Sequence, residues 1–209
     1  MNMCIMRFFL LPCLTLLILS CMLACSDLEY EAEKVEIIYE GQFIDSGPVE
    51  GLKYTTKTQS GLTDSSGIFK YKKREYITFY VGNIQLGDKV LAKEFISPVD
   101  LVAGTVRVEN QAITNMSRFL QSVGGSSTSD NISISEEVTQ IIQSQVSDNK
   151  IDFNVSTESF NQDSEITDIF ENLNKTSGNS NAYTLVSALA AQEKLKTNLV
   201  KTEGKPEYE

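Results

Sequence analysis

Histidine and tryptophan are absent from the sequence, and cysteine is absent beyond the first 25 residues. Without histidine the chain cannot build a Ser-His-Asp or Cys-His catalytic centre, a zinc site with histidine ligands, or the H-E-x-x-H motif of metalloproteases. Without tryptophan it lacks the largest aromatic face for stacking against a sugar. The absence of cysteine beyond Cys25 excludes a disulfide framework in the folded part of the chain.

Basic residues are also few, because 18 Lys and Arg stand against 28 Asp and Glu, for a net charge of −10. Such a surface repels phosphates, and the chain has no extended basic block, so nucleic acid is excluded as a partner. Hydrophobic residues make up 41% and charged residues 22% of the sequence. These fractions are typical of a globular protein, and 209 residues allow one domain or two small ones.

The N-terminal segment has the layout of an export signal. Residues 8–25 carry no charge, Arg7 precedes them, and acidic residues begin at Asp27. A retained transmembrane helix is the alternative, but it needs roughly 20 apolar residues. The uncharged stretch here is only eighteen residues long, with Pro12 among them. We therefore predict a lipoprotein signal peptide over residues 1–24.

The cysteines indicate how this segment ends. A cysteine that follows a small residue at the end of an export signal resembles a bacterial lipobox, in which the thiol is acylated and the cysteine becomes the new N-terminus. Residues 18–21 (ILSC) have the better residue three positions before the cut, whereas residues 22–25 (MLAC) lie at the polar boundary. The sequence favours lipidation at Cys25, with Cys21 as the alternative, because cleavage at Cys21 would leave three apolar residues on the mature arm.

The lipidated cysteine would be followed by an acidic tether over residues 25–34. Residues 26–36 contain five carboxylates and a single lysine, Lys34, which is typical of a solvated linker. Lipoproteins with Ser after the cysteine are usually sorted to the outer membrane, so this class implies a cell-envelope location there, periplasmic or surface-exposed. Each buried CH₂ of a diacylglyceryl or acyl anchor contributes about 0.8 kcal/mol to membrane binding. The membrane is therefore the first expected partner.

Alternating apolar and polar residues predict strands across residues 35–104. Gly, Asp and Ser interrupt the alternation at intervals typical of an antiparallel sandwich. Asp64, within residues 63–67 (TDSSG), predicts a turn in which the carboxylate accepts backbone hydrogen bonds. As a calcium ligand it would stand alone where several oxygens are needed, and no metal site is predicted. The expected strands are residues 35–43, 51–56, 68–72, 76–81, 83–86 and 90–96.

Helical spacing of apolar residues replaces this alternation in residues 105–203. Four helices are predicted: residues 108–123, ended by Gly124; a second that begins after Ser133 or Ser135; a third over about residues 164–174; and a fourth capped by Ser187. The fourth is expected to bury Leu189, Ala191, Leu195 and Leu199. The fold class is therefore α+β: an immunoglobulin-like or transthyretin-like antiparallel β-sandwich over 35–104, a small four-helix subdomain over 105–203, and a polar tail over 204–209.

Three stretches together resemble a β module of proteobacterial surface lipoproteins and adhesin-like proteins: residues 49–54 (VEGLKY), 60–71 (SGLTDSSGIFKY) and 77–87 (ITFYVGNIQLG). Residues 115–121 (NMSRFLQ), 132–134, 151–153 and 185–187 are similar to later landmarks of the same proteins. The β module also resembles the N-terminal module of lipoprotein metalloproteases of the accessory-colonization-factor type. Their zinc-binding helix has no counterpart here, so this resemblance implies no enzymatic role.

The sequence predicts a non-catalytic, lipid-anchored envelope lipoprotein that acts in binding or envelope assembly, with an envelope protein as a second partner. It points to no catalytic residue, no cofactor and no particular binding residue. Two alternatives stay open. One is an accessory subunit of a larger secretion or surface assembly. The other is a hydrolase that works with a pair of carboxylates, which requires two acids at a cleft, one of them with a raised pKa.

Overall fold

The computed structural model describes residues 36–105, 107–124, 130–146, 151–179 and 182–204. From Ile37 onward the chain forms one compact unit. The predicted signal peptide, both candidate lipidation sites, the acidic tether to residue 34 and most of the polar tail lie outside the described residues. No helix within the described ranges is long and apolar enough to cross a membrane.

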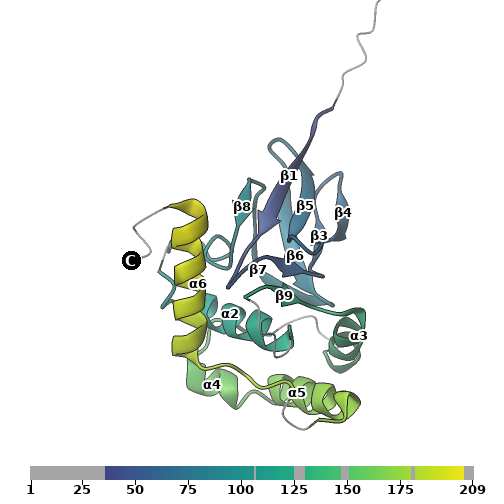
Figure 1. The fold of residues 1–209 in the computed structure, drawn as a ribbon, viewed down its shortest axis with the longest axis vertical. Coiled ribbons are helices and arrows are strands. Elements are labelled where there is room, and N and C mark those ends of the chain that lie inside the picture. The colour runs from purple at the N-terminus through teal and green to yellow at the C-terminus, as the bar shows by residue number, and fades with distance from the viewer. Residues whose placement is uncertain (1–35, 106, 125–129, 147–150, 180–181, 205–209) are drawn as a thin grey trace, which may run out of the picture. The chain divides into compact units, whose positions relative to one another are not determined.

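The chain is a mixed α+β protein (Figure 1). Its strands come first, apart from one short strand that lies among the helices. The strands are β1 (Ile38–Phe43), β2 (Val49–Glu50), β3 (Lys53–Thr55), β4 (Ser60–Leu62), β5 (Ile68–Lys72), β6 (Tyr76–Val81), β7 (Ile84–Leu91), β8 (Phe95–Ile96) and β9 (Ile132–Ser133). The helices are α2 (Gln111–Val123), α3 (Glu136–Gln145), α4 (Thr157–Asn161), α5 (Ser164–Ser177) and α6 (Ala188–Glu203).

The described strands form three sheets, ordered β5-β1-β8, β4-β3-β6-β7 and β2-β9. The four-stranded sheet is antiparallel throughout, and β1 is antiparallel to β5. Two pairs are parallel, β1 with β8 and β2 with β9. The prediction of purely antiparallel sheets is therefore wrong. Each parallel pair joins strands separated by a long stretch of chain, which local alternation in the sequence cannot indicate.

The inward side chains of the three- and four-stranded sheets meet in an aromatic core. The Phe43 and Phe79 rings lie 4.7 Å apart edge to face, and the Phe69 and Phe79 rings 5.2 Å apart. All three side chains are fully buried. Period-two alternation places Phe69 and Tyr71, and likewise Ile77, Phe79 and Val81, on one buried face of their strands, as predicted.

The helices continue this core. In Figure 1, α2 and α3 lie below the sheets, α6 runs along one side, and α4 and α5 lie further below. One hydrophobic cluster contains buried residues of all three sheets and of helices α2 to α5. Leu195 and Leu199 of α6 join a second cluster with Ile44. The strand-rich and helix-rich halves thus bury residues against each other. Either half alone is small and would bury a smaller share of its surface.

Most predicted elements are confirmed, with instructive differences. The expected break between residues 86 and 90 is wrong, because Gly87 adopts φ = +53° and β7 continues through it as one strand. Ser135 caps α3, and Ser187 caps α6 as predicted. Leu189 is 65% exposed, so its placement on the buried stripe of α6 is wrong. Two residues before Ala191, it lies on the opposite side of the helix. The short α4 was not predicted.

Candidate functional site

Asp64 was considered as a calcium ligand in the sequence analysis, and it lies among the described residues. Its Oδ1 accepts hydrogen bonds from the backbone N–H groups of Ser66 and Ile68, at 2.8 and 2.9 Å. Gly67 completes the turn at φ = +73°. The predicted turn role is therefore confirmed. Among the described residues, no group of three or more Asp, Glu, His or Cys side chains is arranged to hold a metal ion.

A groove with a volume of about 910 Å³ lies where β6 and β7 approach the start of α2. Its lining comes from four parts of the chain that are far apart in sequence. The lining residues are Tyr80, Asn83, Gln85, Gly87 and Asp88 of β6–β7, Leu101–Ala103, Asn110, Ala112 and Met116 around the start of α2, and Ile151–Asn154. We call this feature the amide groove, because asparagine and glutamine side chains recur along its walls.

The strand wall of the amide groove is set by Gly87. Its backbone approaches Leu101 so closely that an added Cβ would collide with the Leu101 carbonyl, and the N–H of neighbouring Asp88 donates to that same carbonyl at 2.8 Å. β7 pairs with β6 on one side and has no partner strand on the other among the described residues. One wall of the groove therefore lies along a sheet edge that has no partner strand in the described part of the chain, and Leu101 covers part of this edge.

The helical wall is held by asparagines. Asn110 caps α2, because its side chain accepts from the N–H groups of Ala112 and Ile113. Asn115, one turn further on, is fully buried, and its Nδ2 donates to the carbonyls of Phe153 and Val155 at 3.0 and 2.9 Å. These two bonds fasten the extended segment after residue 150 against α2. The wall is thus fixed by buried polar contacts rather than by apolar packing alone.

The chemistry of the amide groove is polar and free of cations. None of its lining residues is Lys or Arg, and its two carboxylates, Asp88 and Asp152, are both exposed. Asp152 Oδ1 accepts from the Asn154 N–H at 2.8 Å. The walls therefore offer amide donors and acceptors, a tyrosine and two carboxylates. This set suits a neutral or cationic ligand that is rich in hydrogen-bonding groups.

One acid of the described chain is fully buried, and it lies outside the amide groove. Asp45, in the turn after β1, accepts from the Ser46 N–H at 2.6 Å and from Gln121 Nε2 at 2.7 Å. Burial raises the pKa of Asp45 from 3.8 to about 6. Hydrogen bonding with Ser117, Gln121 and Ser46 and the charge of Lys194 lower this pKa, but burial has the larger effect. Because Asp45 joins the β1–β2 turn to α2 and has no exposed surface, its role is structural.

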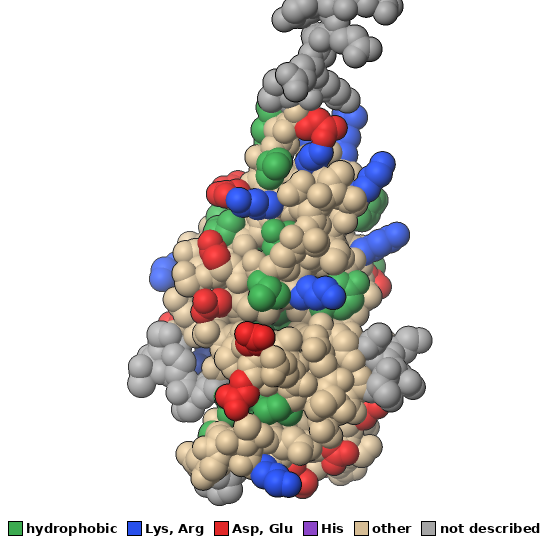
Figure 2. All heavy atoms as spheres, turned by 90° about the vertical axis from the view of Figure 1, so that its right-hand side faces the viewer, with side chains coloured by type: hydrophobic (Ala, Val, Ile, Leu, Met, Phe, Trp, Pro, Cys, Tyr) green, Lys and Arg blue, Asp and Glu red, His purple; other side chains and the backbone are tan. Residues whose placement is uncertain are grey.

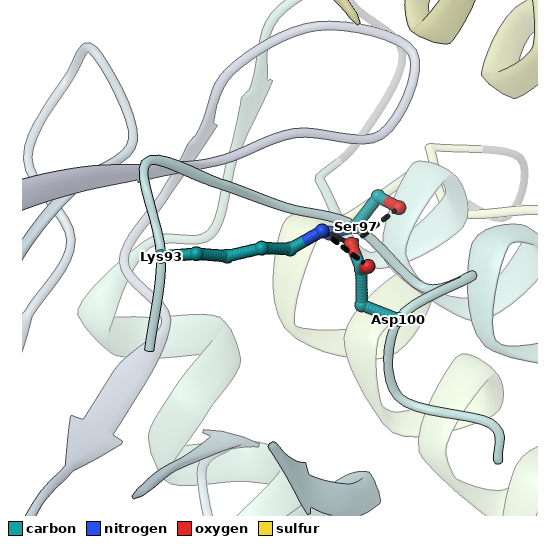
Figure 3. Close-up of polar contacts among 3 residues, drawn as sticks. All are labelled: Lys93, Ser97 and Asp100. Carbon is teal, nitrogen blue, oxygen red and sulfur yellow. Dashed lines mark hydrogen bonds and ion pairs between the residues drawn. The ribbon is translucent and has the colours of Figure 1, made fainter. Parts of the chain in front are cut away.

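A Ser, Lys and Asp cluster follows β7 (Figure 3). Lys93 Nζ lies 2.6 Å from Asp100 Oδ1, and the Ser97 N–H and hydroxyl donate to Asp100 Oδ2 at 2.9 and 3.2 Å. A serine nucleophile activated by lysine would need a bond between Ser97 Oγ and Lys93 Nζ. Instead, both groups contact the carboxylate, and Ser97 is fully buried. The cluster closes the turn after β8 and offers no nucleophile.

Sequence reasoning missed the amide groove. Asn83, Gln85, Asn110 and Asn154 occur in loops and at element ends, where such residues are common for structural reasons, so no local signal distinguishes them. In the sequence, Asn115 stands out only as part of residues 115–121, which resemble a family landmark. The sequence matches no protein-family model, no curated protein and no solved structure.

Proposed function

We propose that this protein is a non-catalytic, lipid-anchored envelope lipoprotein whose amide groove binds an extended segment of another envelope protein. The anchor is the thiol of Cys25, with Cys21 as the alternative, and the outer membrane is the expected site. The two larger sheets would form an immunoglobulin-like or transthyretin-like sandwich, and the helices a subdomain that completes the groove.

The observation that carries this proposal is the coincidence of a free strand edge with amide side chains. A polypeptide lying along the open side of β7 could pair with its backbone, and β-augmentation of this kind is a common way to recognise peptides. Asn154 and the Nδ2 group of Asn110 could bond the other side of such a segment, because side-chain amides match backbone N–H and C=O groups. The Asp88 N–H is already bonded to Leu101, so pairing would use the rest of the strand edge.

The carboxylate hydrolase is less well supported. Asp88 and Asp152 line the groove, yet both are exposed, and a general acid needs an environment that raises its pKa. The Asp or Glu of the described chain whose pKa is clearly raised is Asp45, which is buried elsewhere. An accessory subunit of a larger assembly differs from our proposal only in the partner that occupies the groove.

The anchor is tested by membrane fractionation and mass spectrometry of the native chain and of Cys25→Ser. We expect Cys25→Ser to leave the membrane fraction and to lose the acyl mass, whereas Cys21→Ser keeps both. Acylation that survives in Cys25→Ser and disappears in Cys21→Ser would move the anchor to Cys21. Native chain recovered uncut in the cytosol would reject the anchor.

The groove is tested by photo-crosslinking in cells, with a benzophenone side chain in place of Gln85. We expect an adduct of one defined mass, which disappears when Ala103→Trp fills the groove. The same side chain at Glu171, on the exposed face of α5, is the matched control and should give no such adduct. Equal adducts at both positions, or an adduct unaffected by Ala103→Trp, would reject the groove as the binding site.

A further inference from the structure

The end of the molecule where β1 begins combines basic and exposed apolar side chains. Ile38 pairs with Lys72 at the end of β5, and Tyr76 pairs with Leu91 at the start of β6 and the end of β7. The β5–β6 turn lies between these pairs. Five of the seven large hydrophobic side chains described as exposed are found here: Ile37, Ile38, Tyr39, Tyr76 and Leu91.

Four exposed cations belong to the same end. Lys73 and Arg74 form the β5–β6 turn, and Lys89 lies over the Tyr76 ring, with its Nζ 5.8 Å from the ring centroid. Lys57 is in the β3–β4 hairpin, which reaches this turn because Thr56 Oγ1 donates to Glu75 Oε2 at 2.7 Å. The Glu75 carboxylate, which also accepts from the Lys72 N–H, offsets part of this charge, and the four cations leave an excess of positive charge. We call these nine residues, the five apolar and the four basic, the basic end.

The opposite part of the molecule has the reverse charge. Helices α3, α4 and α5 carry one lysine, Lys175, against six carboxylates: Glu136, Glu137, Glu158, Glu165, Asp168 and Glu171. Figure 2 shows Lys and Arg side chains together with hydrophobic and several acidic ones over the strands, and mostly Asp and Glu over the helices. The net charge of −10 is therefore unevenly distributed.

We infer that the basic end rests on an anionic phospholipid surface, the membrane to which the chain is anchored. This rests on the proposed lipid anchor. Lysine and arginine close to anionic headgroups are attracted to them, and exposed tyrosine, leucine and isoleucine suit the interface. The acidic helices then point away from the surface, which repels them.

The length of the preceding chain is consistent with this contact. The described strand residues begin at the basic end, and the eleven residues from 26 to 36 precede them. Fully extended, these residues span at most about 40 Å. The carboxylates of residues 27–33 are a competing occupant, because they could neutralise the same cations. If the membrane is the occupant, the basic end contacts anionic vesicles in the native chain. If the carboxylates are the occupant, it contacts them only after these acids are made neutral.

The test uses residues 25–209, which include every described residue and a single thiol, Cys25. Coupling this thiol to a maleimide phospholipid anchors the protein to vesicles whether or not the bacterium acylates it. The chain has no tryptophan, so Tyr76→Trp reports on the basic end alone. We expect its emission to shift to the blue on phosphatidylglycerol vesicles and to stay unshifted on phosphatidylcholine vesicles.

Charge reversal identifies the contact. The triple variant Lys57→Glu, Lys73→Glu and Arg74→Glu should abolish the shift, and without coupling should lower partition onto phosphatidylglycerol vesicles about a hundredfold at low salt. The control Arg107→Glu, Lys175→Glu and Lys201→Glu changes the net charge equally and should keep the shift. An equal loss in both triples would overturn the inference. Equal tryptophan emission on the two kinds of vesicle would also overturn it. So would a blue shift that is seen only after the acidic residues 27, 29, 31 and 33 are replaced by neutral ones, because those residues would then be the occupant of the basic end. Because Cys25 is coupled chemically in this test, its outcome can be interpreted even if membrane fractionation rejects the lipid anchor.

Discussion

Helices α2 and α5 have similar lengths but use their polar residues in different ways. α5 buries one stripe, Ile166, Ile169, Phe170 and Leu173, and keeps acids such as Glu171 in solvent. In α2, every residue after Gln111 is buried, six polar ones among them: Thr114, Asn115, Ser117, Arg118, Gln121 and Ser122. An amphipathic stripe packs a helix on one side, whereas a helix buried all round must find hydrogen-bond partners for its polar face.

The polar face of α2 connects segments distant in sequence. Arg118 Nε donates to the Val186 carbonyl at 2.8 Å, and its guanidinium donates to Asn161 Oδ1 at 2.6 Å. Gln121 reaches Asp45, and Ser122 Oγ accepts from the Val186 N–H at 2.9 Å. Together with Asn115, these side chains fix the positions of α4, the residues before α6, the β1–β2 turn and the wall of the amide groove. The polar side chains of α2 thus hold distant segments of the chain together, whereas α5 packs against the core along one apolar stripe.

The largest effect that separates the two helices is expected from Arg118→Ala. Arg118 is 4% exposed, and burial lowers the pKa of its guanidinium. Its removal leaves the Val186 carbonyl and Asn161 Oδ1 without their donor and opens a cavity, for a loss of about 3–5 kcal/mol in the free energy of unfolding. Urea denaturation measures this loss. Lys175→Ala in α5 is the control, and a loss of equal size there would contradict the comparison.

The next effect depends on pH and concerns the acid that Gln121 contacts. Because the pKa of Asp45 rises from 3.8 to about 6 on folding, the folded state prefers the protonated form. The stabilisation is complete below pH ~4 and is lost as the pH rises through 6, a difference of about 3 kcal/mol at neutral pH. Asp45→Asn should therefore stabilise the protein relative to the native chain at pH 7 and much less at pH 4, as measured by urea denaturation.

The exposed Asp64 provides the control for this effect. Asp64→Asn keeps an oxygen for its turn and removes a charge of the same type from solvent, so it should not reproduce the gain in stability expected of Asp45→Asn at pH 7. If Asp45→Asn gives a profile parallel to the native one, ionisation of Asp45 does not oppose folding and its burial has been misjudged.

A smaller effect is expected from Asn115→Ala, about 2 kcal/mol, because the carbonyls of Phe153 and Val155 lose a shared donor. Hydrogen exchange localises the change. The backbone of residues 151–155 should exchange faster, while β6 stays as protected as in the native chain. Uniform loss of protection across the molecule would mean that Asn115 acts on global stability and not on the groove wall.

The smallest effect is expected from Glu171→Ala in α5, within about 0.5 kcal/mol in either direction, because the side chain is exposed. Ile169→Ala in the same helix should cost about 2–4 kcal/mol, because that side chain is fully buried. Thermal unfolding of the pair shows whether α5 depends on its stripe alone. A large loss in Glu171→Ala would remove the contrast with α2.

The helices and strands were largely predictable, because each reflects a local repeat. Residues 68–72 and 76–81 are strands with the predicted bounds, and Ser187 and Gly124 mark the predicted ends of α6 and α2. The continuation of β7 through Gly87 was not predictable, since a glycine between polar residues equally signals a turn. The burial of the polar residues of α2 was also missed, because periodicity identifies which residues are apolar and does not show whether the other face is covered.

The sequence by itself determined the order of the elements, the aromatic core positions and the absence of histidine chemistry, because these follow from composition and short-range spacing. It also supplies the case for an envelope anchor, which remains a prediction. Only the tertiary structure decided that Asp45 meets Gln121, that four distant segments line one groove, and that exposed apolar and basic residues gather at the end where β1 begins. These features depend on contacts between residues tens of positions apart, which are set when the helices and sheets pack together and leave no local trace in the chain.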